Sequence, residues 1–122
     1  MSLPLDELKR RARVKIRLVS DREALLDDIS RTMADEIKRR NAQDLPTRFI
    51  LPVGPVAQYP KLVAICNRER ISWRNVYTFN MDEFLDWQGR PIPVVHPLSF
   101  EGFMRRTLFT ALDPELRMPA DH

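Results

Sequence analysis

The feature that most constrains the fold is a β-prone run that ends abruptly in acidic residues. Residues 76–79 (Val-Tyr-Thr-Phe) favour a pleated, largely buried strand, whereas the polar residues 80–83 that follow cannot stay buried without partners. This change predicts the carboxyl end of a strand. Because ligands of parallel α/β sheets bind outside the carboxyl ends of the strands, we expect Asp82 and Glu83 to face a binding site. The same residues also fit a solvated loop in which an acid caps the next turn.

Elsewhere the sequence alternates predicted strands with predicted helices. Residues 14–19 alternate apolar and basic side chains, as expected of a strand with one wet face. A second, apolar strand is predicted over residues 48–53, and the strand that contains residues 76–81 is the third. This order predicts an α/β fold with an open parallel sheet, right-handed crossovers and flanking helices in a Rossmann-like, three-layer architecture.

Segments with the sequence signals of helices lie between and after the predicted strands. Ser20 and Glu23 form a capping box ahead of apolar residues that recur at helical spacing as far as Ile37. A second helix is predicted over residues 58–69, with its proline in the first turn, where a missing N–H costs nothing. Ser99 is expected to cap a last helix, whose apolar side carries Phe100, Phe103, Met104 and Leu108.

The turn between the second strand and the second helix is a candidate anion site. Helix N-termini offer free backbone N–H groups and a positive dipole end, which suit a phosphate. The candidate positions are Val53, Gly54, Pro55 and Val56. Pro55 has no N–H to donate and the valines carry no hydroxyl, so a Gly-Pro turn without a ligand remains the alternative interpretation.

Composition bounds the class of protein. The 122 residues, of 14.4 kDa, fit one domain, and 20 Lys+Arg against 17 Asp+Glu give a net charge of only +3, too little to indicate nucleic-acid binding. The basic residues between 9 and 17 are interpreted as a solvated entry segment. Cys66 is the only cysteine, which excludes an internal disulfide and predicts a small buried residue.

The absence of membrane and export signals in the sequence favours a cytoplasmic protein. No long apolar run or early signal-like segment is present, and no metal-ligand pattern occurs. Trp73 and Trp87 are interpreted as packing residues.

Several separated motifs carry a family resemblance. Residues 78–84 read Thr-Phe-Asn-Met-Asp-Glu-Phe, residues 96–100 read His-Pro-Leu-Ser-Phe, and Phe-Met follows at 103–104. Residues 59–63 and 71–76 match in register upstream. This arrangement, over about residues 50–109, resembles the glucosamine-6-phosphate deaminase/isomerase family, to which 6-phosphogluconolactonase is related.

The resemblance implies an amino-sugar phosphate isomerase/deaminase-like domain, a hydrolase of carbohydrate metabolism that converts glucosamine 6-phosphate to fructose 6-phosphate and ammonia. It implies that Asp82 is the base that moves a proton between C2 and C1 by way of an enolamine. Phe79 and Phe84 are expected to shield that carboxylate from water. Glu83 is the second catalytic candidate, with orientation of the loop or binding of an amide as its alternative role.

The family holds the sugar phosphate on a loop of the form L-P-T-G-G/S-S/T-P, which implies residues 53–56 as the phosphate-binding positions. Val53 and Val56 replace hydroxyl residues of that loop. The alternative function is therefore a non-catalytic sugar-phosphate-binding or interaction module with a degenerate phosphate loop. The family's H-P-x-S segment implies a supporting, hydrogen-bonded role for His96 and Ser99, with acid/base catalysis as the alternative role of His96.

Family members are about twice as long, and their ring-opening histidine lies in a G-H-x-A-F-N-E-P-like segment that residues 1–122 do not contain. The resemblance thus implies that residues 1–122 are one incomplete domain, the first half of a larger one, inactive alone, with no cofactor or metal. A phosphorylated sugar is the implied partner. An uncovered sheet edge favours a homo-oligomer.

Overall fold

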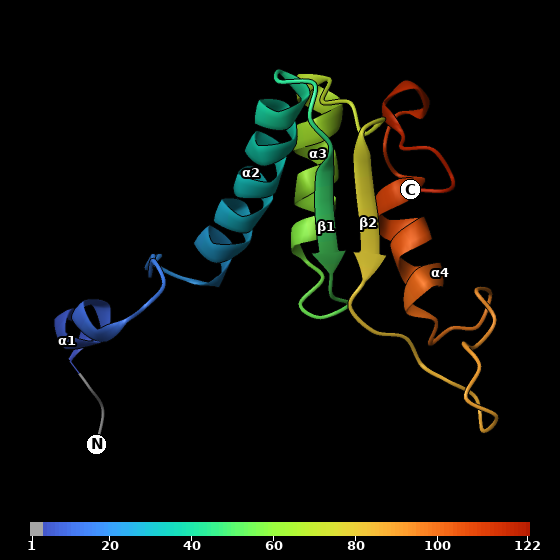
Figure 1. Cartoon of the computed structure of the whole chain (residues 1–122), viewed down its shortest axis with the longest axis horizontal. Helices are drawn as coiled ribbons and strands as arrows, with labels where there is room; N and C mark the ends of the chain where they lie inside the picture. Colours follow the sequence, from blue (N-terminus) through green and yellow to red (C-terminus); the bar gives the residue numbers. More distant parts are fainter. Residues whose placement is uncertain (1–3) are drawn as a thin grey trace.

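A computed structural model describes residues 4–122 as an α/β unit (Figure 1). Its elements, in chain order, are α1 (Leu5–Arg11), α2 (Arg22–Asn41), β1 (Thr47–Leu51), α3 (Gln58–Glu69), β2 (Val76–Asn80), α4 (Phe100–Met104), the π-helical turn η1 (Arg105–Phe109) and the 3-10 turn η2 (Pro114–Leu116). The predicted helix over residues 58–69 is confirmed to the residue, and both strands begin and end within two residues of their predicted bounds.

The two strands pair in parallel, as the alternation of strands and helices predicts. Thr47 lies opposite Val76 and Leu51 lies opposite Asn80, with α3 forming the crossover between the strands. Both strands therefore end at the same edge of the sheet.

The prediction of a strand over residues 14–19 is wrong. This segment is irregular, and Val14 and Leu18 are 74% and 57% exposed. Arg17 fastens it to α2 through Asp28, at 2.6 Å, and the Thr32 hydroxyl. A strand exists only through hydrogen bonds to a partner strand, and alternating side chains alone do not supply one. The preceding segment forms α1, whose last turn contains three basic residues; no helix was predicted there, and α1 buries no residue.

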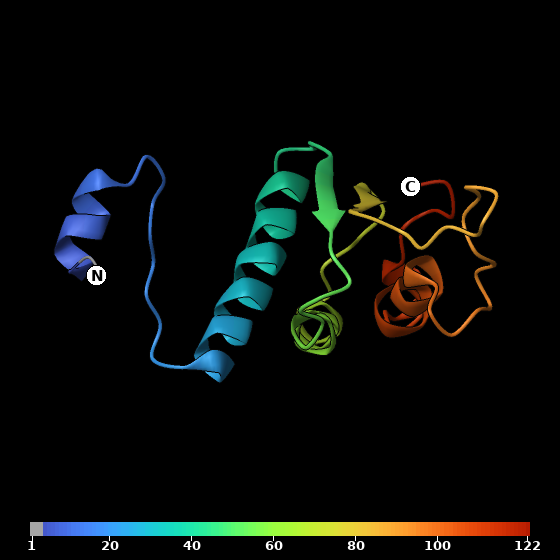
Figure 2. The same cartoon turned by 90° about the horizontal axis from the view of Figure 1, so that it is seen from below.

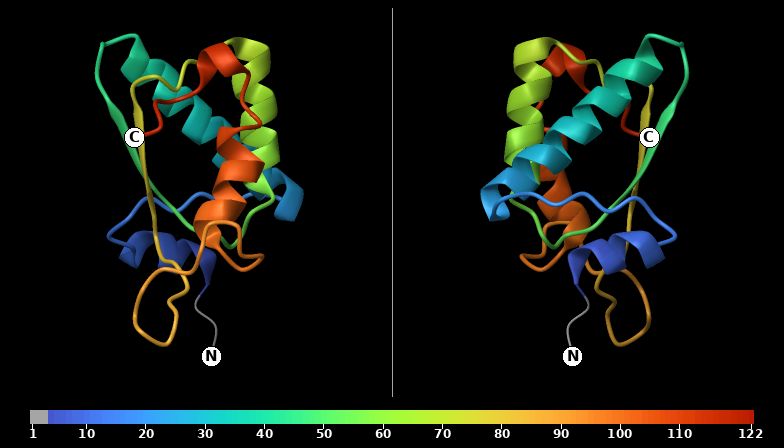
Figure 3. Two further views of the ribbon diagram at one scale, coloured as in Figure 1. Left: turned by 90° about the vertical axis from the view of Figure 1, so that its right-hand side faces the viewer. Right: turned by 90° about the vertical axis from the view of Figure 1, so that its left-hand side faces the viewer.

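The helices α2, α3 and α4 lie on one side of the two-stranded sheet, so the three-layer expectation is not met within residues 4–122. Figure 2 shows α3 and α4 below the strands, and Figure 3 shows α2 on that same side. On the opposite face, Ile50 and Phe79 stand side by side in the register and are 68% and 60% exposed. The described residues thus form two layers, with an apolar sheet face open to solvent.

The core lies between the sheet and its helices. Trp73 is fully buried, and its indole N–H donates to Sγ of Cys66 at 3.3 Å. Trp73 is thus confirmed as a packing residue and Cys66 as a small buried residue. Burial raises the pKa of the Cys66 thiol. Trp87 is 90% exposed, so its interpretation as a packing residue is wrong. It lies in a polar turn after β2, and the helices of the core do not reach it.

One of the two predicted helix caps is confirmed. The Ser99 hydroxyl accepts a hydrogen bond from the Gly102 amide at 3.0 Å at the start of α4. The capping box of Ser20 and Glu23 is wrong, because Asp21 caps α2 by accepting from the Ala24 amide at 2.9 Å. A carboxylate one residue later competes better for the free N–H groups, since it adds charge near the positive end of the helix.

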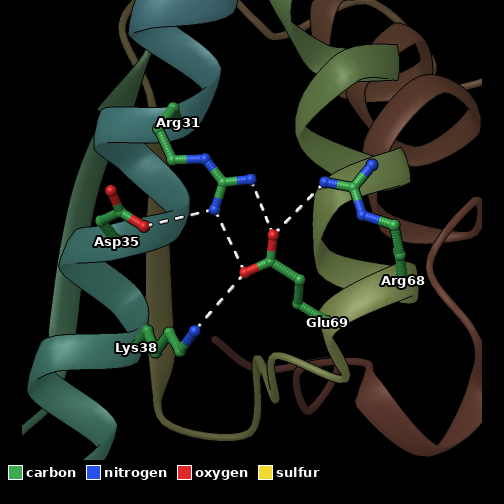
Figure 4. Close-up of polar contacts among 5 residues, drawn as sticks. All are labelled: Arg31, Asp35, Lys38, Arg68 and Glu69. Carbon is green, nitrogen blue, oxygen red and sulfur yellow. Dashed lines mark hydrogen bonds and ion pairs between the residues drawn. The ribbon is translucent and has the colours of Figure 1, made fainter.

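A cluster of charged side chains fastens α2 to α3 (Figure 4). Both guanidinium Nη atoms of Arg31 donate to the two carboxylate oxygens of Glu69, at 2.7 and 3.1 Å, while Lys38 and Arg68 approach the same carboxylate at 3.5 and 3.3 Å. The hydrogen bonds from Arg31, supported by those from Arg68 and Lys38, lower the pKa of Glu69 to about 2. This carboxylate joins the helix of the crossover to the helix beside it.

We predict that Glu69→Gln weakens folding at neutral pH and flattens its acid dependence. The folded-state pKa of Glu69, about 2, is below the ordinary value of about 4.3 in an unfolded chain. The contribution of the pair is therefore complete above about pH 4.3 and is lost as the pH falls towards 2. Urea unfolding at several pH values measures it. The control Asp35→Asn removes a pair of Arg31 within α2. Equal pH profiles for wild type and Glu69→Gln would contradict the prediction.

Candidate functional site

The register of the sheet brings two predicted site segments to one edge. Leu51 and Asn80 are the last paired residues, and the amide of Met81 donates to the carbonyl of Leu51 at 3.0 Å. Val53 and Asp82 each follow two residues beyond these strand ends. The turn at Gly54 and the acidic loop therefore leave the sheet side by side, which is where parallel α/β sheets bind ligands.

Asp82 lies on this edge as an exposed side chain. Within residues 4–122 its carboxylate accepts no hydrogen bond and forms no ion pair. The expected shielding by aromatic neighbours is absent, because Phe79 and Phe84 are themselves 60% and 48% exposed. Phe84 packs instead on Phe100, at a ring separation of 5.0 Å. The carboxylate is thus accessible for proton transfer, but nothing in the described chain removes it from water.

Glu83 has a different environment from its neighbour. Its carboxylate accepts hydrogen bonds from the amides of Phe84, Phe100 and Glu101, at 2.8, 2.9 and 3.0 Å, and from the Ser99 hydroxyl at 3.1 Å. Burial raises the pKa of Glu83, but these hydrogen bonds outweigh it, so the net shift is downwards. A carboxylate held in its ionised form this way ties the acidic loop to the start of α4. This arrangement supports an orienting role for Glu83.

The turn of residues 53–56 presents backbone donors and no hydroxyl. Gly54 and Pro55 are exposed, and nothing lies within 4 Å of the point where a Cβ at Gly54 would stand. The amides of Gly54, Val56 and Ala57 donate no hydrogen bond to any described residue. They precede the 12-residue helix α3, which has no side-chain cap. Free amides at a helix N-terminus can hold an anion.

Polar contacts that were not predicted from the sequence hold this turn in place. The side-chain amide of Gln58 donates to the carbonyl of Pro55 at 2.7 Å, and the Tyr59 hydroxyl donates to the carbonyl of Pro52 at 2.5 Å. The Ser30 hydroxyl lies 2.9 Å from the carbonyl of Gln58, which attaches the first turn of α3 to α2. Oε1 of Gln58 is buried and has no partner in the described chain. A glutamine at the first position of the helix was the available sequence signal.

His96 serves the loop that leads to α4. It is exposed, its Nδ1 accepts from the Leu98 amide at 3.2 Å, and its carbonyl accepts from the Ser99 amide at 3.0 Å. These contacts agree with the expected supporting role, which stays a prediction. Ser99 in turn contacts Glu83, so the loop segment and the acidic segment meet through these two side chains.

A cavity of about 340 Å³ begins at Asn80 and extends along β2 beneath the sheet; neither Asp82 nor Gly54 lines it. In the described part of the chain, no group of three or more His, Cys, Asp or Glu side chains is arranged to hold a metal ion. No helix in residues 4–122 combines the length and the apolarity needed to cross a membrane.

Comparison with known proteins finds relatives over most of the chain. No protein-family model matches the chain. The glucosamine-6-phosphate deaminase of Borrelia garinii subsp. bavariensis is 36% identical over 94 residues, which cover 71% of this chain and 33% of the relative. That of Porphyromonas gingivalis is 37% identical over 94 residues, with 71% and 34% covered. The chain is homologous to part of the glucosamine-6-phosphate deaminases. It spans about a third of the length of these curated relatives.

The deaminase fold extends over most of the chain. A solved monomeric glucosamine-6-phosphate deaminase of the NagB superfamily superposes with a TM-score of 0.65 and 23% sequence identity, over 85% of this chain and 42% of that one. The parallel pair of strands and its helices therefore correspond to part of a NagB-type fold. The resemblance carried by residues 78–84 and 96–104 is confirmed at the level of homology.

We predict that Glu83→Gln destabilises the chain by about 1 kcal/mol at pH 7, the usual cost of losing a helix cap. Since the pKa of Glu83 is lowered on folding, its contribution is present above the unfolded-state value of about 4.3 and disappears as the pH falls through the folded-state value. The difference between wild type and variant should shrink in acid. Asp82→Asn, which removes the adjacent charge and no hydrogen bond, is the control. A constant difference from pH 7 to pH 3, measured by urea unfolding, would contradict this.

Proposed function

We propose that this chain is part of an amino-sugar phosphate isomerase/deaminase that converts glucosamine 6-phosphate to fructose 6-phosphate and ammonia. The observation that carries the proposal is the shared sheet edge: the register places the Asp82 loop beside the Gly54 turn. The homology to glucosamine-6-phosphate deaminases over 71% of the chain supports the substrate class. The enzyme works in the cytoplasm and needs no cofactor.

Asp82 is the proton-transfer base in this proposal. A carboxylate that accepts the C2 proton and returns it to C1 needs an oxygen that the substrate can reach, and Asp82 is exposed and accepts no hydrogen bond within residues 4–122. Substrate that covers the edge supplies the exclusion of water that the open loop lacks. Glu83 assists from the adjacent position by holding the loop on α4, since its carboxylate accepts three amides and a hydroxyl.

The phosphate of the sugar binds at the turn before α3. The free amides of Gly54, Val56 and Ala57 and the positive end of α3 attract the anion. Val53 and Val56 replace hydroxyl donors, and Pro55 has no N–H to donate. A charge-assisted hydrogen bond contributes about 1.5 to 3 kcal/mol, so this loop holds phosphate more weakly than one rich in hydroxyls.

A second candidate function is a non-catalytic sugar-phosphate-binding or interaction module. The exposure of Asp82 and the lack of hydroxyls at residues 53–56 favour it. The deaminase and the sugar-phosphate-binding module share the phosphorylated sugar as their ligand. In either function, we expect the chain to associate with another polypeptide segment or with a second copy of itself. The ring-opening group comes from a segment of the kind that the longer relatives possess, outside residues 1–122.

We predict that the chain catalyses exchange of the C1 protons of fructose 6-phosphate with solvent deuterium, because this step needs a base and an open-chain sugar but no ammonia. Proton NMR in D₂O follows the loss of the C1 signal. Asp82→Asn should slow the exchange by about 100-fold or more, the usual contribution of a positioned general base.

The matched control is Asp44→Asn. Asp44 lies in an exposed turn before β1, at the amino-terminal end of the strands and so away from the candidate site. Asp44 has a φ of 54°, which asparagine tolerates equally well. Exchange equal in Asp82→Asn and wild type would eliminate Asp82 as the base. Binding of the sugar phosphate with no exchange in any variant would support the non-catalytic module.

We further predict negligible deaminase activity for the purified 122-residue chain, since no residue of it matches the ring-opening segment. An ammonia-release assay with glucosamine 6-phosphate measures this. Robust, concentration-dependent ammonia release would show that ring opening is performed within these residues.

A further inference from the structure

We propose that the cavity under β2 binds a small organic carboxylate with an apolar body, at a position separate from the sheet edge that carries the proposed deaminase site. The cavity has a volume of about 340 Å³ and lies between the strand, η1 and residues 117–122. This volume is within the range of small-molecule sites. Neither Asp82 nor Gly54 contributes to its wall.

The carboxyl-terminal residues form one wall of the cavity by running beside the free edge of β2. The amide of Trp73 donates to the carbonyl of Leu116 at 2.7 Å, and the amide of Thr78 donates to the carbonyl of His122 at 2.8 Å. The ring of His122 stacks on Tyr77 at a centroid distance of 3.8 Å. These contacts at both ends hold the intervening segment in place, so the cavity has a defined wall.

Arg117 gives the cavity a positive charge without a counter-ion. Its Nε donates to the carbonyl of Leu112 at 2.9 Å and its Nη2 to the carbonyl of Thr110 at 2.7 Å. Neither acceptor is charged, and the guanidinium forms no ion pair with any carboxylate in residues 4–122. Arg117 is exposed, and its two contacts with backbone carbonyls hold the guanidinium at the cavity wall and leave Nη1 without a hydrogen bond in the described chain.

The other charged groups of the cavity cancel. Arg105 also lines it, but Glu101 neutralises its guanidinium in the same wall at 2.7 Å. The nearby Asp121 is exposed and does not line the cavity. Among the side chains of the wall, Arg117 is therefore the guanidinium that has no carboxylate side chain as a partner in residues 4–122, and a single positive charge matches a monoanion better than a phosphate dianion.

The rest of the wall suits an apolar body with one polar end. Phe109, Met118 and Pro119 supply apolar surface. The side chains of Thr78 and Asn80 make no hydrogen bond within the described residues, and Nδ1 of His122 is shielded from solvent without a partner. A carboxylate that accepts from Arg117 and from the Asn80 amide, with its hydrocarbon part against the apolar wall, satisfies both kinds of surface.

Benzoate is the probe for this site, and benzamide is its neutral counterpart of almost the same shape. Titration of the ¹⁵N-labelled chain with each compound, followed by heteronuclear NMR, should show benzoate shifting the amides of Asn80 and residues 117–120 at millimolar concentration. Benzamide should bind at least tenfold more weakly, because it lacks the charge that Arg117 complements.

Two variants test separately the positive charge of Arg117 and the free volume of the cavity. Arg117→Gln should weaken benzoate binding by tenfold or more while Arg74→Gln, at an exposed arginine without side-chain partners in the described chain, leaves it unchanged. Since Arg117 also supports two carbonyl groups, Ala120→Trp provides an independent test: it places a bulky side chain at the cavity wall, keeps the Arg117 guanidinium, and should also abolish binding.

Equal affinities for benzoate and benzamide would overturn the role of charge, and so would wild-type affinity in Arg117→Gln. No shift of these amides at millimolar benzoate, or shifts confined to the Gly54 turn, would overturn the site itself. Shifts of the same residues by inorganic phosphate but not by benzoate would overturn the carboxylate assignment. None of these outcomes bears on proton exchange at Asp82, so the two proposals fail separately.

Discussion

The parallel pairing of β1 with β2 is the constraint from which the rest of the structure follows. Five residue pairs, from Thr47 opposite Val76 to Leu51 opposite Asn80, fix where both strands end. A shift of one residue would reverse which side chains face the helices. In the observed register Leu51 and Val76 enter the core, and the Gly54 turn and the Asp82 loop leave the same edge. The candidate site is therefore a consequence of strand register.

Polar contacts hold both segments of that edge in position. The Arg31–Glu69 pair fastens the crossover helix α3 to α2, and the hydrogen bonds of Gln58 and Tyr59 attach the turn to α3. On the other side, Glu83 fastens the acidic loop to the first turn of α4. The opposite sheet face, with Ile50 and Phe79, is left open, and an open apolar face of this kind is expected to meet another polypeptide. This open face agrees with the expected self-association of the chain, which stays a prediction.

Local chemistry explains which parts of the fold the sequence could predict. Residues 58–69 and Ser99 combine helical spacing with a first-turn or cap residue, so their own sequence determines the element, and residues 76–79 are strongly β-prone. Residues 14–19 show the alternation of a strand, but a strand requires a partner that local sequence does not specify. The Glu83 hydrogen bonds depend on residues 85–98 folding back, and the exposure of Asp82 depends on what covers the edge. Such long-range features are not contained in any local pattern.

The most direct test of this account is the contact between the two strand ends. In a ¹³C,¹⁵N-labelled sample, the account predicts nuclear Overhauser effects between the amide proton of Met81 and protons of Leu51 and Pro52, together with slow hydrogen exchange of that amide, which donates to the Leu51 carbonyl. Cross-strand contacts from Met81 to Thr47, or an amide that exchanges at the rate of an open chain, would contradict the register and with it the shared edge.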